Sequence, residues 1–339
     1  MSSEQLHVAV VGATGAVGRE MLEVLEERSF PVASLRAMAS CRSAGRQLEW
    51  GGKSIEVEDL EKADFSGVDI ALFSAGSDVS RAHAPRAADA GAVVVDNTSA
   101  FRMDPEIPLV VPEVNAEAID DHAGIIANPN CSTIQMVVAL KPLVADYGID
   151  RLVISTYQSA SGAGQSGVEE LMEGVRATVA GEQEPSPSTF AHPLAFDALA
   201  HIDTFDETGY TREERKMVRE TRKIFDDETL EISATCVRIP VVRCHSEAVT
   251  VDLGQEFEVD DVRQRLREAP GVEVVDNPDA AEYPRSRAAE GTDPCWVGRI
   301  RRDLDRPKTL HFWVVSDNLR KGAALNAVQI AEILAEDNR

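Results

Sequence analysis

A cysteine at the start of a predicted helix is the first residue whose position points to chemistry. The segment Ala127-Asn128-Pro129-Asn130-Cys131-Ser132-Thr133 leads into a helical pattern over 134–143. A helix N-terminus offers a positive dipole end and N–H donors, which lower the pKa of a thiol and steady an oxyanion. A lone cysteine is more often an inert core residue, but this position favours a nucleophile.

A histidine in a second polar segment is a candidate acid and base. The run Arg238-Ile239-Pro240-Val241-Val242-Arg243-Cys244-His245-Ser246 places His245 just past a predicted strand, from which it could project into a cleft. An imidazole exchanges protons near neutral pH. The chain has seven histidines, so a structural role is the alternative. Cys236, Cys244 and His245 could begin a metal site, but no paired ligand cluster or C-x-x-C spacing supports one, and we expect no metal.

A glycine turn near the N-terminus predicts a nucleotide site. Val8-Ala9-Val10-Val11 is an apolar run, and Gly12-Ala13-Thr14-Gly15-Ala16-Val17-Gly18 follows it before a helical pattern with Met21, Leu22 and Leu25 on one face. Glycines in this G-x-x-G-x-x-G spacing allow a tight turn and bring a pyrophosphate close to backbone N–H groups. A plain turn is the alternative, but its place between strand and helix favours dinucleotide binding.

The end of the second predicted strand indicates which nucleotide binds. An acidic residue there would bind the ribose 2′-hydroxyl of NAD. This strand, over about 34–40, instead leads into Cys41-Arg42-Ser43, which suits a 2′-phosphate and favours NADP. A solvated loop arginine is the alternative for Arg42.

Two smaller features are less specific. Gln158-Ser159-Ala160-Ser161-Gly162-Ala163-Gly164 is a polar loop after a strand and could hold an amide against a substrate or a nicotinamide. Glu213 and Lys216 lie three apart on one helix face, and by spacing alone they form a surface ion pair worth under about 1 kcal/mol.

The elements that must position these residues predict two domains. Strands over about 8–11, 34–40, 69–73 and 92–95 alternate with helices, which predicts a doubly wound parallel sheet of Rossmann type. Longer strands over 151–157, 231–242 and 247–253, and a helix that Thr211 opens with a capping box, predict an inserted α+β domain with a mostly antiparallel sheet. We expect an α/β chain with an NADP-binding domain over 1–130, completed by a C-terminal helix over 318–339. A second domain is expected over 131–317, and the family resemblance given below implies that it is the catalytic and dimerisation domain.

Composition excludes several kinds of partner. The 34 basic and 58 acidic residues give a net charge of −24, which disfavours nucleic acid and anionic membranes. We find no stretch of 18 apolar residues and no secretory signal, and the five cysteines are scattered, so we expect a cytoplasmic protein with reduced thiols.

Together these motifs resemble one enzyme family. The start V-A-V-V-G-A-T-G-A-V-G, the box A-N-P-N-C-S-T, Q-S-A-S-G-A-G, the E-E-R-K helix and R-I-P-V-V-R-C-H-S are similar to those of bacterial and archaeal aspartate-β-semialdehyde dehydrogenases over essentially the whole chain. The related N-acetyl-glutamyl-phosphate reductases share the architecture, but their cysteine box normally runs G-C-Y rather than N-C-S.

The resemblance implies a role for each matching residue. Cys131 would be the acyl-thioester nucleophile and His245 the acid/base. Gln158 would orient the substrate and Arg238 would bind its α-carboxylate, while Glu213 would contact its amino group or orient Lys216. Arg102 and Lys216 would hold phosphate. The cofactor-binding residues would be Gly12, Thr14, Gly15, Ala16, Val17, Arg42 and Ser43, with Ser161, Gly162 and Asn318 at the nicotinamide end.

The implied reaction is the reversible, NADP-dependent reductive dephosphorylation of 4-phospho-L-aspartate to L-aspartate-4-semialdehyde. It serves the biosynthesis of lysine and diaminopimelate, threonine, methionine and isoleucine. The substrates would be aspartate semialdehyde, inorganic phosphate and NADP, and the assembly a homodimer or homotetramer. Two alternatives stay open: a reductase of another acyl phosphate, such as N-acetylglutamyl phosphate, and a non-catalytic NADP-binding regulator.

Overall fold

The computed structural model describes residues 5–337 and divides into two units. One unit runs to Asn130 and resumes at Ala323, and the other spans Cys131–Gly322. The expected domain bounds also include residues 1–4 and 338–339, which lie outside the described residues. Within the described chain, no helix is long and apolar enough to cross a membrane.

The first unit is built on a sheet whose strands follow the order β3-β4-β2-β1-β5-β6-β7. All neighbouring strands are parallel except β3 and β4. The strands are β1 (Leu6–Val11), β2 (Val32–Ala39), β3 (Gln47–Trp50), β4 (Lys53–Asp59), β5 (Ile70–Phe73), β6 (Val93–Asp96) and β7 (Ile125–Ala127). The helices are α1 (Ala16–Glu27), α2 (Ser77–Asp89), α3 (Pro112–Asn115) and α9 (Leu325–Asp337), with a 3₁₀ turn η1 (Ala116–Asp121).

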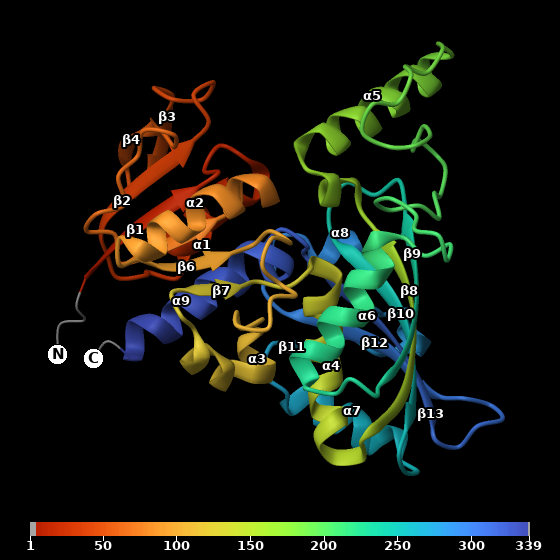
Figure 1. Cartoon of the computed structure of the whole chain (residues 1–339). Helices are drawn as coiled ribbons and strands as arrows, with labels where there is room; N and C mark the ends of the chain where they lie inside the picture. Colours follow the sequence, from red (N-terminus) through yellow and green to blue (C-terminus); the bar gives the residue numbers. More distant parts are fainter. Residues whose placement is uncertain (1–4, 338–339) are drawn as a thin grey trace. The chain divides into compact units, whose positions relative to one another are not determined.

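Alternating residues of β1 explain why helices cover both faces of this sheet. Val8 and Val10 belong to the core cluster that includes α1 and α9, whereas Ala9 and Val11 belong to the cluster that includes α2. Successive side chains of a strand point to opposite faces, so an uninterrupted apolar strand needs cover on both. The doubly wound prediction is confirmed, as is the packing of the C-terminal helix onto this unit (Figure 1).

The second unit is built on a mixed sheet with the strand order β11-β12-β13-β10-β8-β9. Its strands are β8 (Ile149–Gln158), β9 (Glu231–Arg238), β10 (His245–Leu253), β11 (Val272–Val274), β12 (Cys295–Arg302) and β13 (Thr309–Ser316). Its helices are α4 (Cys131–Tyr147), α5 (Gln165–Ala180), α6 (Arg212–Phe225), α7 (Val259–Glu268) and α8 (Ser286–Ala289), with short turns η2 (Ala160–Ala163) and η3 (Pro278–Ala280) and a π-helical turn η4 (Arg320–Ala324) that leads into α9.

Helix α4 lies between the sheet and two other helices. It contacts β8, β10, β12 and β13 on one side and α6 and α7 on the other (Figure 1). Every residue from 132 to 140 is buried, because the helix is enclosed on all sides. The side chains of such a helix must be apolar, or must have their polar groups hydrogen-bonded, all the way round. The opposite face of the sheet carries half-exposed side chains.

Several predicted boundaries are wrong. The strand expected over 231–242 ends at Arg238, because Pro240 follows and the chain turns with Cys244 at a φ of 73°. His245 is therefore the first residue of β10 rather than a residue past a strand. The C-terminal helix begins with the π-helical turn at Arg320, not at Asn318.

Candidate active site

The glycine turn adopts the geometry of a nucleotide-binding loop. Gly12 has a φ of 88°, and a Cβ on it would lie 2.6 Å from the Ser74 carbonyl oxygen. A Cβ on Gly18 would lie 2.2 Å from the carbonyl oxygen of Gly12, so glycine is needed where α1 packs on the turn. Gly15 is the N-cap of α1, and the described residues place neither a capping side chain nor an acidic residue in its first turn. The first N–H groups of α1 therefore suit an anion such as a pyrophosphate.

The two residues expected at the 2′-phosphate lie in the turn after β2. Arg42 is exposed, and the Thr14 hydroxyl lies 3.5 Å from that of Ser43. The structure thus brings the turn after β2 beside the glycine turn. A positive and hydroxyl-bearing turn at this position fits the 2′-phosphate of NADP.

Arg102 also belongs to the first unit, and its side chain is buried. Its guanidinium donates to the carbonyl oxygens of Asn128 (2.9 Å) and Asn97 (3.0 Å), which follow β7 and β6. These bonds hold it at the carboxyl ends of parallel strands, where ligands of doubly wound sheets bind.

In the second unit, three of the predicted residues form a row across the sheet. Gln158 pairs with Arg238 between β8 and β9, and the register that pairs Ser246 with Tyr157 puts His245 beside Gln158. These residues are far apart in sequence, and strand register brings them together on the face covered by α4. All three side chains are at least 95% buried.

The hydrogen bonds of His245 assign its tautomer. Its Nδ1 accepts the backbone N–H of Ser159 (3.1 Å), and because a backbone N–H can only donate, the neutral ring carries its proton on Nε2. Burial, with Arg238 nearby, lowers the pKa of His245 to about 3. Nε2 is buried and has no hydrogen-bond partner among the described residues. His245 therefore presents an N–H donor to whatever group occupies the site.

The loop after β8 meets Asn318 at this histidine. Oδ1 of Asn318 accepts from the hydroxyls of Ser159 (3.2 Å) and Ser161 (3.1 Å) and from the Cys244 N–H (2.9 Å). A Cβ on Gly162 would lie 2.7 Å from Arg238 Nη1 and 3.0 Å from His245 Nε2. Three predicted cofactor residues, Ser161, Gly162 and Asn318, thus lie close to His245, and Gly162 also lies close to Arg238.

Glu213 links this row to the helix α6. Its Oε1 accepts from Gln158 Nε2 (3.1 Å) and its Oε2 from Lys216 Nζ (3.1 Å). Arg238 Nη1 donates to the Ser159 carbonyl (2.6 Å), and burial lowers its pKa. The capping box at Thr211 is present and aligns the first turn of α6, which carries Glu213.

The ion pair that spacing alone indicates for Glu213 and Lys216 is present, but it is not a surface pair. Glu213 is 5% exposed, and Lys216 also binds Asp203 (3.0 Å), a loop residue with a φ of 68°. Burial lowers the pKa of Lys216, but Glu213 and Asp203 outweigh burial and raise it. Lys216 is therefore held as a cation. Asp203 was missed, because a loop carboxylate carries no signal in the sequence for such a contact.

Cys131 is the first residue of α4, as the sequence predicts, and its side chain is partly exposed. Cys131 starts α4, and α4 packs on β8 and β10, so Cys131 lies on the covered face of the sheet that carries the row. Gly322 lies behind it, and a Cβ there would be 2.9 Å from the Cys131 Cβ. The sulfur thus has backbone packed behind it and the positive end of a helix dipole beneath it.

The remaining cysteines differ from Cys131. Cys236 and Cys244 are buried, and burial raises the pKa of both thiols. Between residues 5 and 337, no group of histidine, cysteine and acidic residues is arranged to hold a metal ion. All five cysteines are free thiols.

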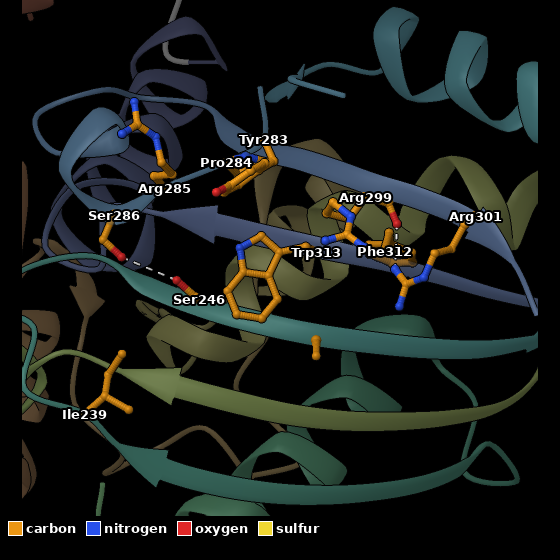
Figure 2. Close-up of a pocket in the computed structure, with 11 residues that line it drawn as sticks. Ile239, Ser246, Tyr283, Pro284, Arg285, Ser286, Arg299, Arg301, Phe312 and Trp313 are labelled. Carbon is orange, nitrogen blue, oxygen red and sulfur yellow. Dashed lines mark hydrogen bonds between the residues drawn. The ribbon is translucent and has the colours of Figure 1, made fainter. Parts of the chain in front are cut away.

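A separate cavity of about 480 Å³ lies on the other face of this sheet. Figure 2 shows Trp313 and Ser246 on its floor, with Arg299 and Arg301 at one side. None of the predicted catalytic residues lines this cavity.

Two family models match the chain. The model described as "Semialdehyde dehydrogenase, NAD binding domain" matches residues 7–122, and the one described as "Semialdehyde dehydrogenase, dimerisation domain" matches residues 140–321.

Full-length relatives agree with these matches. An aspartate-semialdehyde dehydrogenase of Aquifex aeolicus (strain VF5) is 55% identical over 97% of this chain and 98% of its own. The crystal structure of aspartate semialdehyde dehydrogenase II from Vibrio cholerae, complexed with ASA, matches with a TM-score of 0.96 and 49% identity over 99% of both chains. The Candida albicans enzyme, crystallised with NADP, matches with a TM-score of 0.77 and 27% identity over 99% of both chains.

Proposed function

The chain belongs to the aspartate-semialdehyde dehydrogenase family and has that enzymatic activity, and we propose that it works as a cytoplasmic, NADP-dependent enzyme through a Cys131 thioester. The resemblance read from the sequence is confirmed, and the enzyme acts in the biosynthesis of the aspartate family of amino acids. An acetylglutamyl-phosphate reductase and a non-catalytic regulator lose their support.

The observation that carries the proposed mechanism is the row of Gln158, Arg238 and His245 in one strand register, on the face of the sheet covered by α4, whose first residue is Cys131. Acyl transfer from an amino-acid phosphate requires a nucleophile, a donor to the developing oxyanion and a cation that binds the substrate carboxylate.

The first step is acyl transfer. The Cys131 thiolate attacks the acyl carbon of 4-phospho-L-aspartate, the C–O bond to phosphate breaks, and inorganic phosphate leaves. Arg238 binds the α-carboxylate, and Gln158, held by Glu213, orients the acyl group. Lys216, kept charged by Glu213 and Asp203, binds the phosphate, and for Arg102 the same role stays a prediction from the resemblance.

The second step is reduction of the thioester. When bound, NADPH would supply a hydride to the acyl carbon, and the glycine turn and the turn after β2 are the parts of the chain that would hold it. The Nε2–H of His245 donates a hydrogen bond to the resulting oxyanion. The oxyanion then collapses to the carbonyl as the C–S bond breaks, which releases the semialdehyde and the Cys131 thiolate, and the acid/base role of His245 stays a prediction from the resemblance. A neutral ring suits this role, because the lowered pKa of His245 keeps Nε2–H as a hydrogen-bond donor and Nδ1 as an acceptor.

NADP rather than NAD is supported by the turn after β2. The family model concerns NAD binding in general, and the residues present here are Arg42 and Ser43 in place of a carboxylate. The glycine turn and the first turn of α1 would hold the pyrophosphate through Gly12, Thr14, Gly15, Ala16 and Val17.

The test is reduction of NADP⁺ by the purified protein with L-aspartate-4-semialdehyde, with and without inorganic phosphate. N-acetylglutamate semialdehyde runs in parallel, and Cys131→Ala serves as the control. We expect phosphate-dependent activity on the aspartyl substrate alone, lost in the variant. Activity that survives in Cys131→Ala would refute the thioester.

The open face of the second sheet supports a homodimer, or a tetramer built from dimers. Half-exposed apolar side chains gather there, and the rings of Tyr157 and Trp313 pack with centroids 5.3 Å apart. Uncovered apolar faces of this kind pair with a second surface. Trp313→Glu should lower the mass measured by light scattering to that of a monomer, and an unchanged mass would place the interface elsewhere.

A further inference from the structure

A second row of side chains lies directly below the catalytic row. In strand register this row contains Val314, Glu247, Thr156 and Cys236. The row below that is entirely apolar and contains Phe312, Val249, Ile154 and Ala234. Because residues two apart on a strand share a face, Glu247 points to the same side as His245. A carboxyl group therefore lies between the active site and the apolar core.

Glu247 faces the first turn of α4, which starts at Cys131. Its side chain is 0% exposed, and the side chains beside its carboxyl group are Ser132 and Gln135, which are buried as well. Apart from Ser132 and Gln135, neither carboxyl oxygen meets a hydrogen-bond donor among the residues that the structure describes. The amide nitrogen of Gln135 is buried too, and Glu247 is the acceptor that it faces among the described residues. A buried carboxylate with so few donors would be strongly destabilising.

The charge state of this group follows from its surroundings. Burial raises the pKa of Glu247 well above its usual range, and the dipoles of Gln135 and Ser132 offset only part of this. The titratable groups around it are His245 on its own strand, Cys131 on α4 and Cys236 on β9, with Glu213 and Glu214 of α6 facing Cys236. Thr156 and Val314, its partners on β8 and β13, do not titrate. A negative charge on Glu247 would disfavour the thiolate form of Cys131.

We propose that Glu247 is a positioning residue that, as a neutral carboxylic acid, pairs with Ser132 and Gln135 and fixes the helix turn carrying Cys131. A carboxylic acid has one O–H donor and one C=O acceptor, which match the C=O and N–H of the Gln135 amide. The pairing holds α4 against β10 without placing a charge beneath the nucleophile. This inference rests on the proposed role of Cys131.

The test compares Glu247→Gln, which keeps the shape and removes the acid, with Glu247→Leu, which removes the polar pairing. Val249→Ala, one pleat lower on the same face, is the control for loss of core packing. The rate at which iodoacetamide alkylates Cys131 is followed against pH by mass spectrometry of its peptide, because Cys41 is exposed and also reacts. The kcat, the KM for each substrate and the melting temperature are measured on the same proteins.

We expect Glu247→Gln to keep kcat within threefold and to leave the pH midpoint of alkylation in place. Glu247→Leu should lower kcat at least tenfold with the KM for NADP unchanged, whereas Val249→Ala should only lower the melting temperature. A Glu247→Gln protein that alkylates about tenfold faster at pH 7 would reveal a charged carboxylate and overturn the inference. A Glu247→Leu protein with wild-type kcat would overturn it as well.

If Glu247→Leu does not fold, infrared spectroscopy decides. A carboxylic-acid C=O band at pH 7 that is present in the wild type and missing in Glu247→Gln supports the inference, and its absence from the wild type refutes it. Activity retained by Cys131→Ala would instead overturn the proposed function, so the two failures are distinguishable.

Discussion

A single methyl group added at Gly162 should disable the active site while leaving the fold intact. Gly162 lies in η2, and its φ is outside the left-handed region, so alanine is compatible with the backbone. The new Cβ would lie 2.7 Å from Arg238 Nη1 and 3.0 Å from His245 Nε2. Attractive contact between heavy atoms begins at about 3.5 Å, so these groups must move by roughly 0.5–0.8 Å.

Neither neighbour can move freely. Arg238 is bonded to the Ser159 carbonyl and His245 to the Ser159 N–H, and both side chains are at least 95% buried. A displacement of about 1 Å at reacting groups costs on the order of 100-fold in rate, so we expect kcat/KM to fall about 10- to 100-fold. This loss corresponds to about 1.4–2.7 kcal/mol of transition-state stabilisation.

The assay is steady-state NADP⁺ reduction at saturating phosphate, paired with a thermal melt. Gly174→Ala in α5 is the matched control, because its Cβ would meet the Ala195 side chain at 3.1 Å, in a cluster that contains no predicted catalytic residue. We expect Gly174→Ala to keep full activity and Gly162→Ala to melt within a few degrees of wild type. A Gly162→Ala enzyme with more than half of wild-type kcat/KM would refute the assigned positions of Arg238 and His245.

Three further changes test other parts of the structure. Arg238→Leu should lower kcat/KM for the semialdehyde about 100-fold or more while the Kd of NADP, measured by fluorescence, stays within threefold; equal losses would contradict carboxylate binding. Arg42→Ala should raise the KM of NADP at least tenfold and leave that of NAD unchanged, and parallel changes would remove the 2′-phosphate contact. The pKa of His245 is lowered to about 3 in the folded protein. Between pH 6.5 and 3 the unfolded chain therefore binds one proton more at this residue than the folded protein does, and the free energy of unfolding falls as the pH falls. His245→Gln should reduce that slope by about 1.4 kcal/mol per pH unit in denaturant titrations, and an identical slope would mean that His245 is charged in the fold.

Much of the site could be predicted because its signals are local. The glycine turn lies between a strand and a helix that are adjacent in sequence, and Cys131 is the first residue of its helix. The capping box at Thr211 likewise involves residues three apart. In each case the physical requirement, a left-handed turn, a helix end or a cap, acts over a few residues.

Other predictions failed because the deciding contact is distant in sequence. Glu213 and Lys216 appear to be a surface pair by spacing, yet packing of α6 buries the glutamate and a loop brings Asp203 to the lysine. Helical periodicity does not contain this information. The strand expected to reach residue 242 is a different case, because it stops at Arg238 before Pro240, a signal that lies in the sequence itself.

By itself, the sequence determined the family, the two-domain α/β plan, the place of Cys131 at a helix start and the glycine turn, since these depend on residues close together in the chain. Only the tertiary structure decided how the site is assembled. The pairing of β8 with β9 and β10 aligns Gln158, Arg238 and His245, and the same register puts Glu247 one pleat below. A shift of one residue in that register would turn all of these side chains to the opposite face, and no local pattern specifies it.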